Sequence, residues 1–314
     1  MNTNILIDTD AGMDDIVAIL MLMAKLSNRI IGISTVFGLV NPDTGARNLL
    51  KILDYVSIKK EICVGSLRAL SRISWNDSFP AQDCINSTQL TFLRSALSVS
   101  SMTVPTTIPI EKWYGQKVLN SSRRTTIFCL GPLTNIAKVI NKYGMAFEKK
   151  IAQLIIMGGA VQTKGNVGPD FVSEYNFFLD PKAASIVCSS SIPIRLVSLD
   201  GCRQLPCDKK QLFKIPTNPY GMIIKKIIDN NKNDFKYFYD PLAASVILNP
   251  SIASFTKRQS CTVIQKGENK GKIVQADNPI KNIRVINKVN TTLFYSLLNS
   301  IMKRDPLSII NRNP

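Results

Sequence analysis

Four aspartates lie within eight residues near the start of the chain, in the sequence Asp8-Thr9-Asp10-Ala11-Gly12-Met13-Asp14-Asp15. Carboxylates this close repel one another and raise one another's pKa unless a cation lies among them. Hard oxygen ligands at flexible spacing suit Ca²⁺ or Mg²⁺, so the segment indicates a divalent-metal site. A plainer interpretation stays open, in which Asp14 and Asp15 only favour a helix start and Asp8 and Asp10 accept hydrogen bonds from loop amides.

The absence of histidine limits the chemistry that the chain can perform. None of the 314 residues is a histidine. This excludes a Ser-His-Asp triad, a Cys-His dyad, a histidine zinc site and any histidine general acid. Proton transfer must therefore fall to carboxylates, tyrosine, lysine, cysteine or water.

The net charge of +17 comes from 39 basic and 22 acidic residues. The basic residues form dispersed pairs such as Lys59-Lys60 and Arg123-Arg124, without the aromatic interleaving of a nucleic-acid platform. We therefore expect a solvated surface, no nucleic-acid partner and, because no apolar run is long enough to span a bilayer, no membrane. Seven cysteines without Cys-x-x-Cys spacing and no signal-peptide pattern favour a reduced, cytoplasmic protein.

The elements that must position the aspartates alternate between strand and helix. This alternation predicts an α/β fold, a single domain over residues 1–314 with a mainly parallel central sheet flanked by helices. Ligands in such folds bind at the carboxyl ends of the strands. Strands are expected over 4–7, 30–36, 126–130, 154–157, 194–199, 261–265 and 283–287, and helices over 14–26, 42–55, 134–143, 181–188, from 240 and over 291–302.

The acidic segment resembles the Asp-x-Asp-x-Gly-x-Asp-Asp signature of the nucleoside hydrolases (nucleoside N-ribohydrolases). Further stretches resemble that family in the same order: Leu130–Ala137, Met157–Ala160, Gly165-Asn166, Glu174–Asn176 with Asp180-Pro181, and Tyr239–Ala243. The resemblance implies one α/β domain that hydrolyses the N-glycosidic bond of a ribonucleoside and uses Ca²⁺.

Residue roles follow from the resemblance, motif by motif. It implies that Asp10 is the catalytic base and that the metal ligands are Asp10, Asp15, Asp240 and the main-chain carbonyl of Leu130. It implies that the ribose hydroxyls are held by Asp14, Asn166, Glu174 and Asn176. Other interpretations stay open: Asp240 precedes a proline, as a helix cap does, and Glu174 and Asn176 also fit a surface loop.

The position before Asp240 bears on the base. Many family members have a histidine there, whereas this chain has Tyr239. An aromatic residue at this position resembles the purine-preferring (inosine–adenosine–guanosine) branch, in which the base lies between aromatic rings; Trp75 is the candidate opposing ring, and the stretch from Met157 is also closer to that branch. Trp75 also fits an ordinary half-buried loop residue. Phe235, Tyr237 and Phe238 fit either a lid or helix packing.

One departure and two rival functions remain. Leu39 stands where the family usually has Asn or Asp near the ribose. This departure and the missing histidine favour a non-catalytic nucleoside-binding protein as one alternative. Asp8-Thr9-Asp10 faintly resembles the nucleophile motif of haloacid-dehalogenase-type phosphatases, the second alternative. The partner expected for the main prediction is a small-molecule ribonucleoside substrate, and we expect the protein to form a homo-oligomer, a dimer or a tetramer.

Overall fold

The structure is a computed structural model that describes residues 3–71, 103–230, 236–277 and 279–303. Two residues named above, Trp75 and Phe235, lie outside the described residues. No helix among the described residues is long and apolar enough to cross a membrane.

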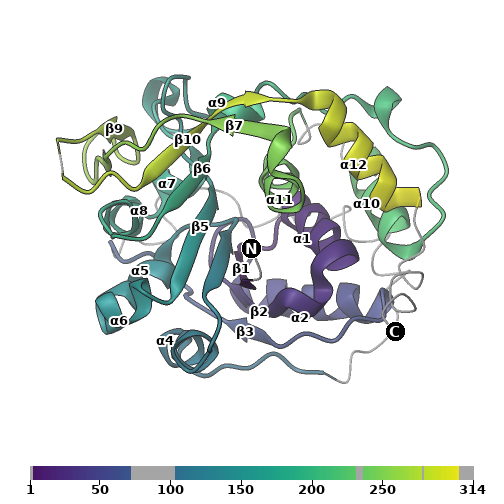
Figure 1. The fold of residues 1–314 in the computed structure, drawn as a ribbon, viewed down its shortest axis with the longest axis horizontal. Coiled ribbons are helices and arrows are strands. Elements are labelled where there is room, and N and C mark those ends of the chain that lie inside the picture. The colour runs from purple at the N-terminus through teal and green to yellow at the C-terminus, as the bar shows by residue number, and fades with distance from the viewer. Residues whose placement is uncertain (1–2, 72–102, 231–235, 278, 304–314) are drawn as a thin grey trace.

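A mostly parallel sheet forms the centre of the molecule, as the alternating sequence predicted (Figure 1). Its order is β3-β2-β1-β4-β5-β6-β10-β7, and only β7 runs antiparallel, against β10. A separate antiparallel pair is formed by β8 and β9. The strands are β1 (Asn4–Thr9), β2 (Ile30–Thr35), β3 (Ile62–Val64), β4 (Thr125–Cys129), β5 (Ile151–Met157), β6 (Ile194–Val197), β7 (Ala253–Phe255), β8 (Cys261–Val263), β9 (Ile273–Gln275) and β10 (Ile283–Val289).

Helices cover both faces of this sheet (Figure 1). One layer contains α1 (Met13–Leu26), α2 (Pro42–Tyr55), α10 (Pro219–Asn230), α11 (Asp240–Leu248) and α12 (Thr291–Lys303). The other contains α4 (Ile110–Tyr114), α5 (Thr134–Tyr143), α6 (Met145–Glu148) and α8 (Pro181–Cys188). The short helices α7 (Tyr175–Leu179) and α9 (Leu199–Cys202) follow the carboxyl ends of strands β5 and β6.

The strand β1 shows why the sheet has this two-sided core. Its apolar residues alternate between the layers: Ile5 and Ile7 pack with α1 and α2, whereas Leu6 packs with Trp113 of α4. All three are fully buried. A parallel strand covered on both faces reads as a nearly continuous apolar run, and this one does.

The expected elements agree with the observed ones to within a few residues, including the cap of α2, where the Asn41 side chain accepts a hydrogen bond from the Asp43 amide. The sequence did not predict β3, β7, β9 or α4. β3, β7 and β9 have three residues each, too few for a periodic pattern to show.

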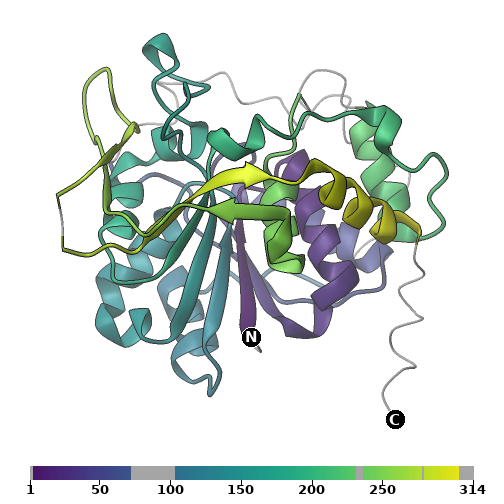
Figure 2. The same cartoon turned by 45° about the horizontal axis from the view of Figure 1, so that its top comes forward.

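The carboxyl ends of the central strands meet at one edge of the sheet. Asp8 on β1 pairs with Ser34 on β2 and Cys129 on β4, so the loops after these strands start side by side. In Figure 2 the N-terminus, where β1 begins, lies at the lower edge of the sheet, which places these loops at the upper edge. The predicted site residues follow these strands.

Candidate active site

The turn from β1 into α1 contains Asp10 and leads directly to Asp14 and Asp15 in the first turn of α1. Ala11 adopts a left-handed conformation (φ 59°), which turns the chain sharply after Asp10. The Thr9 hydroxyl accepts a hydrogen bond from the Ala11 amide (3.0 Å) and donates one to the Asp15 carboxylate. Thr9 therefore fixes both the turn and the orientation of Asp15.

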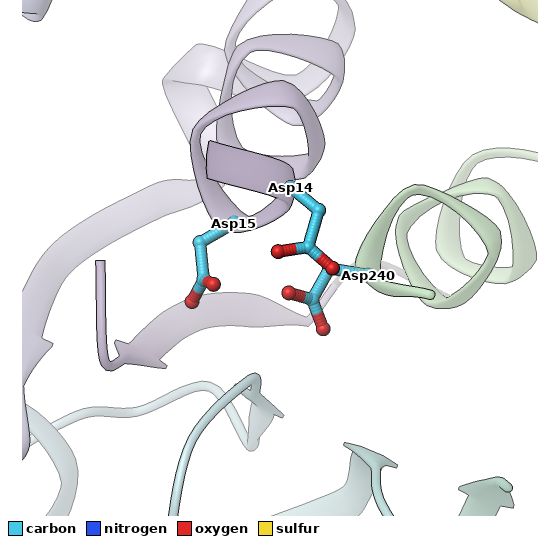
Figure 3. Close-up of side chains that lie close together, drawn as sticks. All are labelled: Asp14, Asp15 and Asp240. Carbon is cyan, nitrogen blue, oxygen red and sulfur yellow. The ribbon is translucent and has the colours of Figure 1, made fainter. Parts of the chain in front are cut away.

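Three carboxylates converge at the start of α1 and α11. One oxygen each of Asp14, Asp15 and Asp240 lies within 4.8 Å of the others, and Figure 3 shows the side chains pointing toward one another. The N-cap residue of α11 is Tyr239, without a side-chain cap, and Asp240 is the first helical residue. The alternative interpretation of Asp240 as a capping residue is therefore wrong.

Unpaired oxygens in this cluster and on neighbouring Asp10 fit a cation, although Asp10 is not one of the three carboxylates whose oxygens come within 4.8 Å of one another. Asp10 Oδ1, Asp15 Oδ2 and Asp240 Oδ1 are buried and have no hydrogen-bond partner among the described residues. Burying a charged carboxylate oxygen without a partner is costly unless it is protonated or binds a metal. Because every candidate donor here is oxygen, the cluster suits a hard divalent cation.

The pKa values describe the same crowding. Burial, and to a smaller extent the negative charge of Asp14, raises the pKa of Asp15 to about 7. Burial, followed by the charge of Asp15, raises the pKa of Asp10 well above its ordinary value. Burial and the charges of Asp14 and Asp15 do the same for the pKa of Asp240. A cation among these groups would favour their charged forms.

The end of β4, which leads into Leu130, is fastened to β1 next to Asp10. The Leu130 amide donates to the Asp8 carbonyl (2.8 Å). Gly131 allows the close approach, since a Cβ there would lie 2.9 Å from Cβ of Asp10. The Leu130 carbonyl already accepts a hydrogen bond from Asn176 Nδ2 (3.1 Å), and its second lone pair is available to a ligand.

Leu39 contributes its main chain rather than a polar side chain. Its amide donates to Asp10 Oδ2 (3.0 Å), and Gly38 beside it leaves no room for a side chain against Asp10. The Leu39 side chain approaches Gly12, where a Cβ would meet its Cδ1 at 2.6 Å. Asp10 is therefore held at one oxygen and unpaired at the other.

The residues predicted to hold the ribose do not share one environment. Glu174 and Asn176 are buried, so a surface-loop location for them is wrong. Both Glu174 oxygens accept amide hydrogen bonds, among them those of Gly159 and Asn176 (2.9 Å each). Asp14 is half-buried, and Asn166 is exposed on the loop that follows β5.

Met157, the last residue of β5, contributes to the floor of this region. It is buried, and both its carbonyl (3.3 Å) and its sulfur (3.9 Å) lie within reach of Asn176 Nδ2. Asn176 therefore joins the ends of β4 and β5.

Tyr239 is half-buried and is the N-cap residue of α11. Burial raises the pKa of its hydroxyl to about 12. Tyr237 lies edge-on to it, with ring centroids 6.3 Å apart. Phe238 is buried against Phe294 and Tyr295, which places it in the core and confirms the packing interpretation for this residue.

Two aspartates beside the site make contacts that the sequence did not indicate. Asp8 Oδ1 accepts hydrogen bonds from Ser34 (2.5 Å) and Asn135 (2.7 Å), away from the other aspartates, and its Oδ2 is buried without a partner among the described residues. Asp180 caps α8 by accepting a hydrogen bond from the Ala183 amide (3.1 Å), and its carboxylate also accepts from the Thr134 hydroxyl (2.6 Å) and the Leu70 amide (2.8 Å).

Comparisons with known proteins agree with this geometry. The family described as inosine-uridine preferring nucleoside hydrolase matches residues 5–296. Uridine nucleosidase 1 of Arabidopsis thaliana is 29% identical over 270 residues, which cover 81% of this chain and 76% of that protein. Pyrimidine-specific ribonucleoside hydrolase RihA of Shewanella sp. (strain MR-7) is 31% identical over 234 residues, covering 73% and 70%.

Solved structures show the same fold. The plant nucleoside hydrolase PpNRh1 superposes with a TM-score of 0.80 at 23% identity, covering 97% of this chain and 100% of that one. A purine-preferring ribonucleoside hydrolase from Gardnerella vaginalis gives 0.77 at 21% identity, covering 95% and 98%.

These findings decide between the fold's possible chemistries. The phosphatase alternative is wrong, because the family match spans nearly the whole chain and Asp8 is bonded to Ser34 and Asn135 rather than placed with Asp10. The chain belongs to the inosine-uridine preferring nucleoside hydrolase family and is a nucleoside hydrolase.

Proposed function

We propose that this enzyme hydrolyses the N-glycosidic bond of purine ribonucleosides, giving ribose and free base, with Ca²⁺ bound at the aspartate cluster. The observation that carries the metal site is the convergence of the Asp14, Asp15 and Asp240 carboxylates, together with buried oxygens on Asp15, Asp240 and neighbouring Asp10 that have no partner among the described residues. The Leu130 carbonyl adds a fourth oxygen from the end of β4.

The donor set favours Ca²⁺ over Mg²⁺. Three carboxylates and a main-chain carbonyl would form a site made almost wholly of protein oxygens. Ca²⁺ accepts such sites, whereas Mg²⁺ demands octahedral geometry and usually keeps several waters. When bound, the ion would orient the attacking water, lower its pKa and bind two ribose hydroxyls.

We assign the role of base to Asp10. Its Oδ2 accepts the Leu39 amide hydrogen bond, and its Oδ1, which has no partner among the described residues, would face both the ion and the attacking water and accept a proton from that water. Cleavage passes through a ribosyl cation, similar to the oxocarbenium state of glycosidases. The carboxylate of Asp14, half-buried beside the cluster, would stabilise that developing positive charge.

A 2′-deoxynucleoside should be a poor substrate. The half-buried carboxylate of Asp14 would lose a hydroxyl partner, whereas Glu174 and Asn176 keep their hydrogen bonds to main-chain groups. Stranding the Asp14 carboxylate, and losing one hydroxyl contact to the ion, should lower kcat/KM for 2′-deoxyinosine by about 100-fold or more relative to inosine. Steady-state kinetics with the two substrates measure the ratio, and similar values would contradict the ribose assignment.

Tyr239 is proposed to act on the base through its ring. A hydroxyl with a pKa of about 12 is a poor acid at neutral pH, whereas the ring can stack on a purine and favour its protonation at N7. Tyr239→Phe should therefore retain most activity on inosine. Tyr239→Ala should lose about 5- to 30-fold in kcat/KM, corresponding to about 1–2 kcal/mol of stacking.

The two substitutions separate ring from hydroxyl. If the hydroxyl were the acid, Tyr239→Phe would be as damaged as Tyr239→Ala. Because a pyrimidine has no N7, uridine and cytidine should react slowly with the unmodified enzyme. Efficient uridine hydrolysis together with an inactive Tyr239→Phe variant would overturn the proposed role of the ring and the purine preference.

A pyrimidine preference is the second candidate, because several relatives at 28–31% identity are named pyrimidine-specific ribonucleoside hydrolases. A reducing-sugar assay on inosine, adenosine, guanosine, uridine and cytidine distinguishes the two candidates. Release of ribose mainly from uridine and cytidine would favour the second. Nucleoside binding without release of ribose from any of them would support a non-catalytic binding protein and contradict hydrolysis.

We further propose that the enzyme acts in the cytoplasm as a homo-oligomer. The six cysteines among the described residues are all free thiols, and five of them are buried, which suits a reducing compartment. Analytical ultracentrifugation tests the expected dimer or tetramer. A monomer at micromolar concentration would contradict it.

A further inference from the structure

The helix α9 and the residue after it, Arg203, form a series of hydrogen bonds with residues 159–165, which follow β5. The Leu199 amide donates to the Gly159 carbonyl (2.9 Å). The Asp200 carboxylate then accepts from the Val161 amide at Oδ2 (3.0 Å) and the Gln162 amide at Oδ1 (2.7 Å). Both oxygens of Asp200 are thus used to hold main-chain amides.

Arg203 continues this series one turn later. Its guanidinium donates to the Thr163 hydroxyl and to the Gly165 carbonyl (2.8 Å). Residues three apart lie on the same side of a helix, which is why Asp200 and Arg203 reach neighbouring parts of one segment. Together they bind residues 161–165 through a carboxylate at one end and a guanidinium at the other.

Other contacts hold the segment mainly at its two ends: Val161 packs half-buried against the core, and the Gly165 amide donates to the Phe171 carbonyl (2.5 Å). Between them Gln162 and Lys164 are exposed, so apolar packing contributes little there. Fixing the backbone of a residue costs about 1–2 kcal/mol of conformational entropy, which hydrogen bonds to Asp200 and Arg203 offset.

This segment leads directly into two residues of the proposed ribose site. Gly165 precedes Asn166, and the Asn166 amide donates to the Ser173 carbonyl (2.8 Å) immediately before Glu174. Gly165 leaves no room for a side chain against Ser173. The place where Arg203 binds Gly165 is therefore one residue from Asn166 and in contact with the residue before Glu174.

We propose that Asp200 and Arg203 are positioning residues for ribose recognition, which hold the segment 161–165 so that Asn166 meets the ribose hydroxyls. The inference rests on the proposed ribose role of Asn166. Its physical basis is preorganisation: an exposed side chain contributes to binding only when the backbone that carries it is already fixed. Neither residue needs to touch the substrate.

The test compares Arg203→Gln and Asp200→Ala with a matched control. Arg29 is also half-buried and donates to the same kinds of group, the Thr3 carbonyl (3.0 Å) and the Thr3 hydroxyl (3.2 Å), at the amino end of the sheet. Arg29→Gln should leave the site unchanged. Arg203→Lys keeps a positively charged donor, so its exchange rate and its KM for inosine should lie between those of Arg203→Gln and the unmodified enzyme.

The first readout requires no activity. Hydrogen–deuterium exchange of peptides covering 158–168, measured without substrate, should become faster in Asp200→Ala and Arg203→Gln and remain unchanged in Arg29→Gln. Exchange that stays unchanged in all variants would overturn the proposal, because the segment would then be held by other contacts.

The second readout ties the segment to Asn166. Arg203→Gln should raise the KM for inosine about 10-fold with a smaller change in kcat. In an Asn166→Ala background the same substitution should change KM by less than about twofold, since the group it positions is gone. Full additivity of the two substitutions would overturn the proposal even if exchange increases.

Failure of the proposed function would give a different result. An unmodified enzyme that releases ribose from none of the five nucleosides would contradict hydrolysis and leave the positioning proposal testable by binding. In that case the Kd for inosine, measured by calorimetry, replaces KM in the same set of variants. An Arg203→Gln variant with unchanged Kd would then overturn the positioning proposal.

Discussion

Asp10→Asn is expected to lower kcat/KM for the preferred nucleoside by about 1,000-fold or more, equivalent to about 4 kcal/mol of barrier. The amide oxygen of asparagine can still accept the Leu39 hydrogen bond that Asp10 Oδ2 accepts at 3.0 Å. The substitution therefore keeps the local structure and removes the proton acceptor at Oδ1 and the negative charge. Steady-state kinetics measure the loss.

Asp8→Asn is the matched control. Asp8 is equally buried and lies two residues earlier on β1, but it is bonded to Ser34 and Asn135 instead of the carboxylate cluster. An asparagine there can accept the same hydrogen bonds through its amide oxygen, so activity should stay within about 10-fold of the unmodified enzyme. Equal losses in the two variants would argue for a structural role of both aspartates and against Asp10 as the base.

Much of the fold follows from local signals in the sequence. The β1 strand, the α1 helix and the Asn41 cap of α2 each depend on residues close together in the chain, and each was predicted within a few positions. The short strands β3, β7 and β9 depend on neighbours far away in the sequence. Three residues are too few for a periodic pattern, so these strands are specified by the sheet they join.

The site was predictable where one motif carries several groups, as Asp14 and Asp15 do at the start of one helix. Their convergence with Asp240 could be predicted only from the family resemblance, because Asp15 and Asp240 are 225 positions apart in the sequence. Asp200 and Arg203 escaped notice for a different reason. They bind main-chain groups of another loop, and nothing in their own surroundings in the sequence marks such a contact.

Asp8 shows the opposite limit of sequence reasoning. Spacing alone places it with Asp10, because residues two apart in a strand share a face. The strand β1 ends at Thr9, however, so Asp10 belongs to the turn at Ala11 and the alternation no longer applies to it. Burial raises the pKa of Asp8 to about 7, and hydrogen bonds from Ser34 and Asn135 oppose the rise. Its role is to join β1 to β2 and α5 beneath the site.

Removal of the divalent ion is the second large expected effect. Chelation should lower the activity to about 1% of the starting rate or less, because the ion supplies several kcal/mol of charge stabilisation. Addition of Ca²⁺ should restore the activity. Asp240→Asn should weaken Ca²⁺ binding by about 100-fold or more, measured by calorimetry, because it removes the unpaired Oδ1 charge.

Asp180 provides the matched control for Asp240. Both residues start a helix in the sequence Asp-Pro-x-Ala-Ala, but Asp180 caps α8 through the Ala183 amide (3.1 Å) and Asp240 caps nothing. Asparagine is as good a cap as aspartate, so the Asp180→Asn variant should keep most of the stability of the unmodified protein. Its Ca²⁺ affinity should not change, because Asp180 is not one of the proposed ligands. Full activity in the presence of chelator, or equal Ca²⁺ affinity in both variants, would contradict the metal assignment.

The pH dependence of stability gives an independent measure of the same site. Burial and neighbouring carboxylates raise the pKa of Asp15 to about 7 and those of Asp10 and Asp240 well above the ordinary value. Without the ion, the folded protein therefore binds more protons than the unfolded chain between about pH 4 and 7, so its free energy of unfolding falls as the pH rises through this range.

With Ca²⁺ bound the sign of this contribution changes. The ion competes with protons for the same carboxylates, so its binding strengthens, and its stabilisation of the folded state grows, as pH rises toward and above about 7. We therefore expect the Tm difference between calcium-loaded and chelated protein to widen from about pH 5 to pH 8. Asp8 lies outside the cluster and contributes equally to both forms, so it cancels in this difference. Asp240→Asn should remove most of the difference, whereas a gap that is constant or narrows with rising pH would place the ion elsewhere.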